Sequence, residues 1–121
     1  IELKKAANDF KRSLDGSDII DCVKADMHFH EIIYDATNNR RLLQILSNLR
    51  EQMYRYRFEY IKDESGHDNL VNEHRMIYES IIRQDKGKAA EAAKLHIDNQ
   101  EKSVIRQIRL EQEHAAKKRR V

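Results

Sequence analysis

Apolar residues recur along this chain at intervals of three and four positions, a spacing that places them on one face of an α-helix. The first such stretch runs from Ile1 to Leu14, and Gly16 stands where that helix is expected to end. The second continues to about Ala36, with Ser17 or Asp18 as its cap. The pattern therefore opens with two amphipathic helices joined by a short connection.

The segment "TNN" after the second stretch predicts a turn, with Asn38 in the left-handed conformation and Asn39 as the next N-cap. Three more helical stretches follow. They run from Arg40 to about Lys62, from about Asn69 to Gln84, and from near Lys88 to the end of the chain. Between the first two of these, "KDESGHDN" holds turn formers and no apolar residue, which predicts a loop.

No stretch alternates apolar and polar residues in the way that a strand requires. Helices with single apolar faces and short connections favour an all-α, antiparallel helical bundle. A chain of 121 residues is large enough for one hydrophobic core and too small for two. We therefore expect residues 1–121 to form a single domain.

Ionisable residues interrupt the apolar stripes of three helices. Asp26 and His30 lie four positions apart, on the stripe that also carries Val23 and Ile33. His74 stands in register with the apolar residues of the fourth stretch, and His96 with the alanines of the fifth. One inward histidine is usually a core residue bonded to a carbonyl group, but four inward ionisable residues together need another explanation.

A divalent cation is the explanation that we favour for these four residues. Burying Asp26 without a partner would cost several kcal/mol, and neutral imidazoles cannot balance its charge. A cation can, because it accepts imidazole nitrogen and carboxylate oxygen in one coordination shell. The sequence therefore predicts a metal site formed by Asp26, His30, His74 and His96. We expect the metal to be zinc. Nickel, manganese, iron and cobalt are alternatives, because the set contains no thiolate that would select zinc.

The other histidines and the cysteine are weaker candidates for this site. His28 lies two residues from both Asp26 and His30, which turns it to the far side of the helix. His67 falls in the predicted loop and His114 in the charged tail, so we expect both in solvent. Cys22 precedes Asp26 by one turn, and we interpret it as a packed thiol.

Composition excludes several classes of protein. A formal net charge of +2 does not make the whole chain an electrostatic binder of nucleic acid, although "KKRRV" at the end is basic. No apolar run approaches the ~20 residues that cross a bilayer, and the start of the chain does not read as a signal peptide. We therefore expect a cytoplasmic protein without a membrane anchor.

Two segments resemble a known family. They are "DMHFHEIIYDATNNRRLL" and "EHRMIYESIIRQDKGKAAEAAKLH". The first contains Asp-x-x-x-His, and the second a Glu-His that precedes a final histidine by 22 residues. Together they resemble the FCD domain, the ligand-sensing C-terminal domain of the FadR subfamily of GntR transcription regulators. By this resemblance, Asp26, His30, His74 and His96 match the metal ligands of its metal-binding members.

The resemblance implies a homodimeric regulator in which a small organic acid binds near the metal and alters DNA binding. Members carry an N-terminal winged helix-turn-helix, and nothing in this chain corresponds to it or to the family's first sensor helix. DNA binding is therefore expected only through a domain that this chain lacks. We also expect the amphipathic first helix to offer an apolar strip to a dimer partner.

Arginine side chains on the third helix are candidates for holding the effector's carboxylate, because a guanidinium binds it with two hydrogen bonds. The candidate contacts are Arg57, Arg50, Tyr60 and Asn99. Two other functions stay open: a purely structural metal site, and a metal-dependent hydrolase. Glu73 is next to His74 in the chain and so points about 100° away from it, and we do not expect it to serve as a base. We therefore expect no enzymatic activity.

Overall fold

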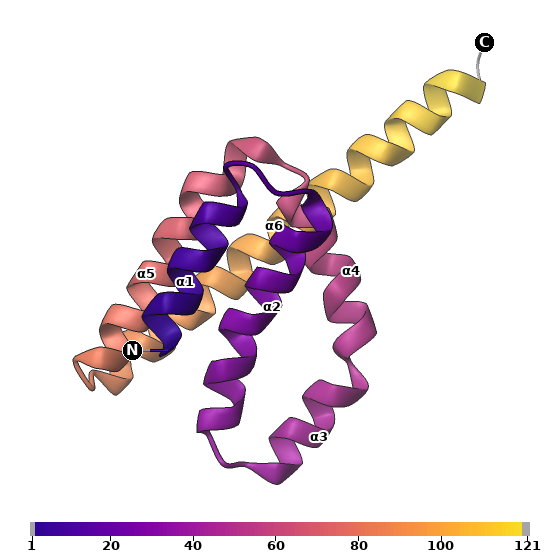
Figure 1. The fold of residues 1–121 in the computed structure, drawn as a ribbon. Helices are drawn as coiled ribbons and strands as arrows, with labels where there is room; N and C mark the ends of the chain where they lie inside the picture. Colours follow the sequence, from indigo (N-terminus) through magenta and orange to yellow (C-terminus); the bar gives the residue numbers. More distant parts are fainter. Residues whose placement is uncertain (1, 120–121) are drawn as a thin grey trace.

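The computed structural model describes residues 2–119, and all of their regular elements are helical. In chain order they are α1 (Glu2–Ser13), α2 (Ile19–Ala36), α3 (Arg40–Asn48), α4 (Arg50–Ile61), the 3₁₀ helix η1 (Glu64–Gly66), α5 (His67–Ile82) and α6 (Lys86–Arg119). Helices α1, α2, α5 and the first half of α6 lie side by side, and α3 and α4 form an arm that returns from the end of α2 (Figure 1). The prediction of an all-α bundle is confirmed.

The boundaries of α2 follow from local hydrogen bonds that the sequence predicted. Asp18 caps the helix by accepting a hydrogen bond from the backbone N–H of Asp21 at 2.9 Å. At the other end Asn38 has a φ of 51°, a left-handed conformation that asparagine tolerates. Asn39 then caps α3 by accepting the N–H of Leu42 at 3.0 Å. Both predictions for the "TNN" turn are confirmed.

The end of α1 differs from the prediction. The helix ends at Ser13, and Gly16 lies three residues further on without a positive φ. The Ser13 hydroxyl donates a hydrogen bond to the carbonyl oxygen of Phe10, and the backbone N–H of Leu14 bonds to the same oxygen. The last turn of α1 is therefore closed by serine and not by a left-handed glycine.

The long third helix that we predicted is broken into two. Leu49 has φ −96° and ψ 0°, outside the helical range, and serves as both the end of α3 and the start of α4. The residues that face the core in the second half also differ from those of a continuous helix. Tyr56, which would share an apolar stripe with Leu49 in such a helix, is 54% exposed, whereas Arg57 is buried. The prediction of one continuous apolar stripe from Arg40 to Lys62 is therefore wrong.

The predicted loop "KDESGHDN" is shorter than expected, because it contains η1 and because α5 begins at His67, two residues before the predicted start. His67 is half-buried, and its Nε2 lies 2.8 Å from the carbonyl oxygen of Ile61. The expectation that His67 is a solvated loop residue is therefore wrong. This contact ties the start of α5 to the end of α4.

Two groups of buried side chains form the core. One joins α1, α2, α4, α5 and α6 through Phe10, Cys22, Val23, Met27, Tyr60, Ile61, Leu70 and Val104. The other joins α1, α2, α5 and α6 through Ala6, Ala7, Phe29, Ile77 and Ala92. The apolar stripe of α1 is buried in this core. It therefore does not offer a dimer partner the exposed apolar strip that we expected. None of the described helices is long and apolar enough to span a membrane.

Candidate metal centre

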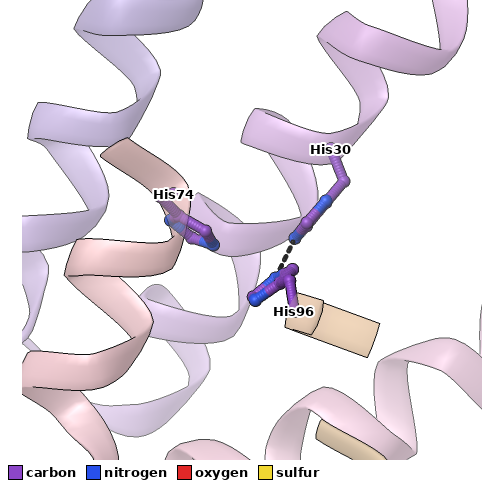
Figure 2. Close-up of side chains that lie close together, drawn as sticks. All are labelled: His30, His74 and His96. Carbon is purple, nitrogen blue, oxygen red and sulfur yellow. Dashed lines mark hydrogen bonds between the residues drawn. The ribbon is translucent and has the colours of Figure 1, made fainter. Parts of the chain in front are cut away.

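Three histidines from three helices meet between the two halves of the core. His30 comes from α2, His74 from α5 and His96 from α6, and Figure 2 shows their rings converging on one point. One nitrogen from each ring lies within 4.8 Å of the other two. His74 and His96 are each 1% exposed and His30 is 8% exposed. Residues far apart in the sequence thus form one buried cluster.

Asp26 completes the set from the helical turn before His30. Its Oδ1 lies 2.8 Å from Nε2 of His74 and 3.3 Å from Nε2 of His30. Nε2 of His30 in turn lies 3.3 Å from Nε2 of His96. The four residues predicted from the sequence are therefore close enough together to hold a metal ion.

These distances fit a shared cation. Four donors at the 2.0–2.1 Å typical of zinc stand about 3.3 Å apart in a tetrahedron, and about 3 Å apart in an octahedral arrangement. Despite their short separation, Oδ1 of Asp26 and Nε2 of His74 are not aligned for a hydrogen bond and have no other partner. Buried polar atoms without partners are uncommon in proteins. The donor set and its unpaired atoms fit a divalent metal.

The second oxygen of Asp26 is held by α4. Nε of Arg57 donates to Oδ2 at 3.1 Å, and the Tyr60 hydroxyl donates to the same oxygen. Arg57 also reaches the Tyr34 hydroxyl at 3.4 Å. One side of the carboxylate is thus fixed by a cation and a phenol, which leaves Oδ1 directed at the histidines.

The cluster alters the proton affinities of its members. Burial raises the pKa of Asp26, but His30 and His74 favour the carboxylate and bring its pKa well below the ordinary value. Burial lowers the pKa of His30 to about 4, although Asp26 opposes the shift. Burial and the charge of Asp26 raise the pKa of Tyr60 well above normal, so that it stays a hydrogen-bond donor. At neutral pH His30 is therefore an uncharged imidazole, the form that binds metal.

Glu73 orients His96 from the neighbouring helix. Its Oε1 lies 2.6 Å from Nδ1 of His96, and its Oε2 accepts a hydrogen bond from the Asn99 side-chain amide at 2.9 Å. A carboxylate on Nδ1 keeps the proton there and leaves Nε2 as the donor atom, an arrangement common around protein metals. Glu73 does point away from His74, as the helical spacing predicts, and this direction brings it to His96 on α6.

His74 is held differently. Its ring stacks on Phe29 at 4.2 Å between centroids and tilts against Phe10 at 4.7 Å. Neither ring nitrogen makes a hydrogen bond within the described part of the chain. Aromatic packing therefore sets the orientation of His74, where a carboxylate sets that of His96.

The remaining candidates lie outside the cluster. His28 and His114 are exposed, as predicted. Cys22 is buried, and its Sγ donates to the carbonyl oxygen of Ser13 at 3.2 Å, so it is a packed thiol as predicted.

Two cavities flank the centre, and the four candidate effector contacts are divided between them. Arg57 and Arg50 line a cavity of about 270 Å³ among α2, α3 and α4. Tyr60 and Asn99 line one of about 260 Å³ among α4, α5 and α6. Arg50 is exposed and pairs with Glu31 at 3.3 Å. The structure therefore does not gather all four contacts around one cavity.

Comparison with known proteins gives the family. The chain is similar to the uncharacterized HTH-type transcriptional regulator YdhC of Bacillus subtilis (strain 168), with 24% identity over 96 residues. The similar region is 78% of this chain and 41% of that protein, so the chain spans less than half of the relative's length. No solved structure matches the chain. The FCD domain family matches residues 1–99, which include all four residues of the centre, and the chain therefore belongs to the FCD domain family of transcription regulators.

Proposed function

We propose that this domain binds a divalent metal through Asp26, His30, His74 and His96 and uses it to sense a small organic acid. The observation that carries the proposal is the convergence of three imidazole nitrogens and one unpaired carboxylate oxygen at a buried point. When bound, the metal would supply a charge that compensates Asp26 and attracts an anionic effector. The membership of the FCD family supports a sensory role.

The charges around the centre favour an anionic effector. The buried charged side chains are the carboxylates Asp26 and Glu73 and the guanidinium of Arg57. Metal-binding histidines are neutral, so a divalent ion leaves the group with one positive charge in excess. One carboxylate of an effector neutralises that excess, and an unbalanced charge at this depth is costly.

The cavity among α2, α3 and α4 is the better place for the effector. It carries both arginines, and Arg57 joins it directly to Asp26. Its apolar lining, from Met27, Leu43, Leu46 and Met53, can cover the carbon skeleton of an acid. A volume of about 270 Å³ lies just below the range typical for drug-sized ligands, which favours a small molecule.

The geometry favours a sensor over a hydrolase. A metal-dependent hydrolase needs a base that is free to take a proton from the attacking water. Both oxygens of Glu73 are engaged, by His96 and by Asn99, and Oδ2 of Asp26 is engaged by Arg57 and Tyr60. No further buried carboxylate lies in the described part of the chain. We therefore propose a binding domain without catalytic activity.

Metal content tests the centre itself. The variant His74→Ala should lose bound metal in elemental analysis and lose the rise in melting temperature that zinc gives to the wild type. His28→Ala, which alters an exposed histidine on α2, should change neither. Unchanged metal content in His74→Ala would remove the central claim.

Calorimetry of the zinc-loaded protein with a panel of small carboxylic acids tests the effector. Saturable binding without turnover supports a sensor, turnover supports a hydrolase, and no binding by any acid leaves a structural metal site. Arg50 touches none of the four ligands, so Arg50→Ala should weaken acid binding by roughly tenfold without changing metal content. Arg55→Ala, exposed on the same helix, is the matched control and should bind the acid as the wild type does.

We propose that acid binding alters DNA binding in a longer regulator that contains this domain. An acid bound between α2 and α4 changes how these helices pack, and it can shift an attached DNA-binding domain only by its difference in affinity for two states. Couplings of this kind are worth about 1 to 3 kcal/mol. We also propose that the regulator is a homodimer, which light scattering at increasing concentration tests.

A further inference from the structure

The side-chain amide of Gln100 is hydrogen-bonded to Nε2 of His96, the nitrogen that would bind the metal. Gln100 lies on α6 one turn after His96, and its side-chain nitrogen is 2.9 Å from Nε2 of the imidazole. Because Glu73 holds the proton of His96 on Nδ1, Nε2 is a bare lone pair that can only accept. The amide N–H of Gln100 therefore donates to the lone pair that a metal would use.

A nitrogen has one lone pair in the plane of the imidazole ring, so this hydrogen bond and a metal bond at Nε2 exclude each other. The Gln100 amide must leave before His96 can bind a metal. Oδ1 of Asp26 and Nε2 of His74 make no hydrogen bond in the described part of the chain, and Nε2 of His30 makes one, to Nε2 of His96 at 3.3 Å. Nε2 of His96 therefore meets both His30 and Gln100, and the contact with the Gln100 amide, at 2.9 Å, is the shorter of the two.

The cavity beside Gln100 can accept its side chain once the amide leaves His96. Gln100 lines the cavity of about 260 Å³ among α4, α5 and α6, so its amide can turn away without movement of the backbone. Other polar side chains line the same cavity, among them Asn69, Lys102 and Ser103. They offer the amide new hydrogen-bond partners, which lowers the cost of its leaving.

We propose that Gln100 is a positioning residue that gates the metal centre: it caps Nε2 of His96 in the metal-free protein and turns into the α4–α5–α6 cavity when metal binds. The proposal rests on the metal site proposed above. The hydrogen bond from Gln100 gives the buried Nε2 of His96 a partner in the metal-free protein. Because this bond must break before metal binds, it lowers the metal affinity of the site. It also couples metal occupancy to the polar lining of a cavity on the side of the centre away from the two arginines.

Zinc affinity, measured by competition with a chromophoric chelator, tests the gate. Gln100→Leu removes the amide at nearly constant size, and Gln100→Asn keeps an amide that is one methylene too short to reach His96. Both variants should bind zinc roughly three- to tenfold more tightly than the wild type, as expected for loss of one competing hydrogen bond. Gln112→Leu, exposed further along α6, is the control and should bind as the wild type does.

A second measurement does not depend on affinity. In chelator, Gln100→Leu should melt below the wild type, because Nε2 of His96 is then buried without a partner. In zinc the two proteins should melt together, since the cap is absent from both. Unchanged or weaker zinc binding in the two variants would overturn the gate, and weaker binding would mark Gln100 as a metal ligand instead. A wild type that binds no zinc would overturn the metal site as well, which separates the two failures.

Discussion

The two sides of the candidate metal centre support their candidate ligands with groups of opposite charge. On the α2–α4 side, the carboxylate of Asp26 is supported by the guanidinium of Arg57 and the hydroxyl of Tyr60. On the α5–α6 side, the imidazole of His96 is supported by the carboxylate of Glu73. In each case the supporting group engages the atom that points away from the centre. Each side therefore fixes one donor atom and turns it towards the centre.

The difference shows how each side behaves without a metal. A buried carboxylate keeps its full charge, so the α2–α4 side depends on Arg57 for stability. The imidazole of His96 needs a hydrogen-bond partner at each nitrogen, and Glu73 and Gln100 supply them. We therefore expect the first side to govern stability and the second to govern metal affinity.

Removing Arg57 should have the largest effect. In Arg57→Leu the carboxylate of Asp26, 0% exposed, keeps only Tyr60 as a partner on that side. Breaking a buried ion pair costs about 3–5 kcal/mol, and we expect a loss of that size in the free energy of unfolding of the metal-free protein. Zinc should recover part of it by supplying a positive charge. Denaturant unfolding in chelator and in zinc measures both, and Arg50→Leu, at an exposed ion pair, should cost less than about 1 kcal/mol.

Acidification should act on His30, which lies between the two sides. Its pKa is lowered from 6.5 to about 4 in the folded protein, so between these values the unfolded chain binds a proton that the folded chain does not. Stability of the metal-free protein should therefore be highest above pH 6.5 and fall by up to about 3 kcal/mol as the pH drops to 4. Unfolding measured across this range in His30→Gln should show a much smaller fall. An equal fall in both proteins would assign the effect to other groups.

Neutralising Glu73 should lower metal affinity with less effect on stability. Glu73→Gln preserves the shape of the side chain but removes the charge that holds the proton on Nδ1 of His96. Loss of such a supporting carboxylate typically weakens metal binding 10- to 100-fold, or about 1.4–2.7 kcal/mol. Chelator competition measures this, and Glu91→Gln, exposed near the start of α6, serves as the control. A Glu73→Gln variant that loses stability rather than affinity would erase the contrast between the two sides.

The ligand set was visible in the sequence because it depends on positions within single helices. Asp26 and His30 share a face at a spacing of four, and His74 and His96 interrupt apolar stripes whose direction is fixed by neighbours such as Ile77 and Ala92. A residue on a buried face points to the interior whatever the other helices do. The caps at Asp18 and Asn39 were predictable for the same reason, since each bonds to an N–H three residues away.

The supporting groups were decided only by the tertiary structure. Glu73 lies off the face of His74 and reaches the centre through a neighbouring helix, so its role depends on the register between α5 and α6. Arg57 is buried on α4, which begins at the break at Leu49, and no pattern in the sequence predicted that break. Sequence periodicity thus determined the helices other than the α3–α4 pair, their inward faces and the four candidate ligands. The packing of one helix against another determined which polar atoms meet, because contacts between helices depend on rotation and offset, which periodicity along a single helix does not specify.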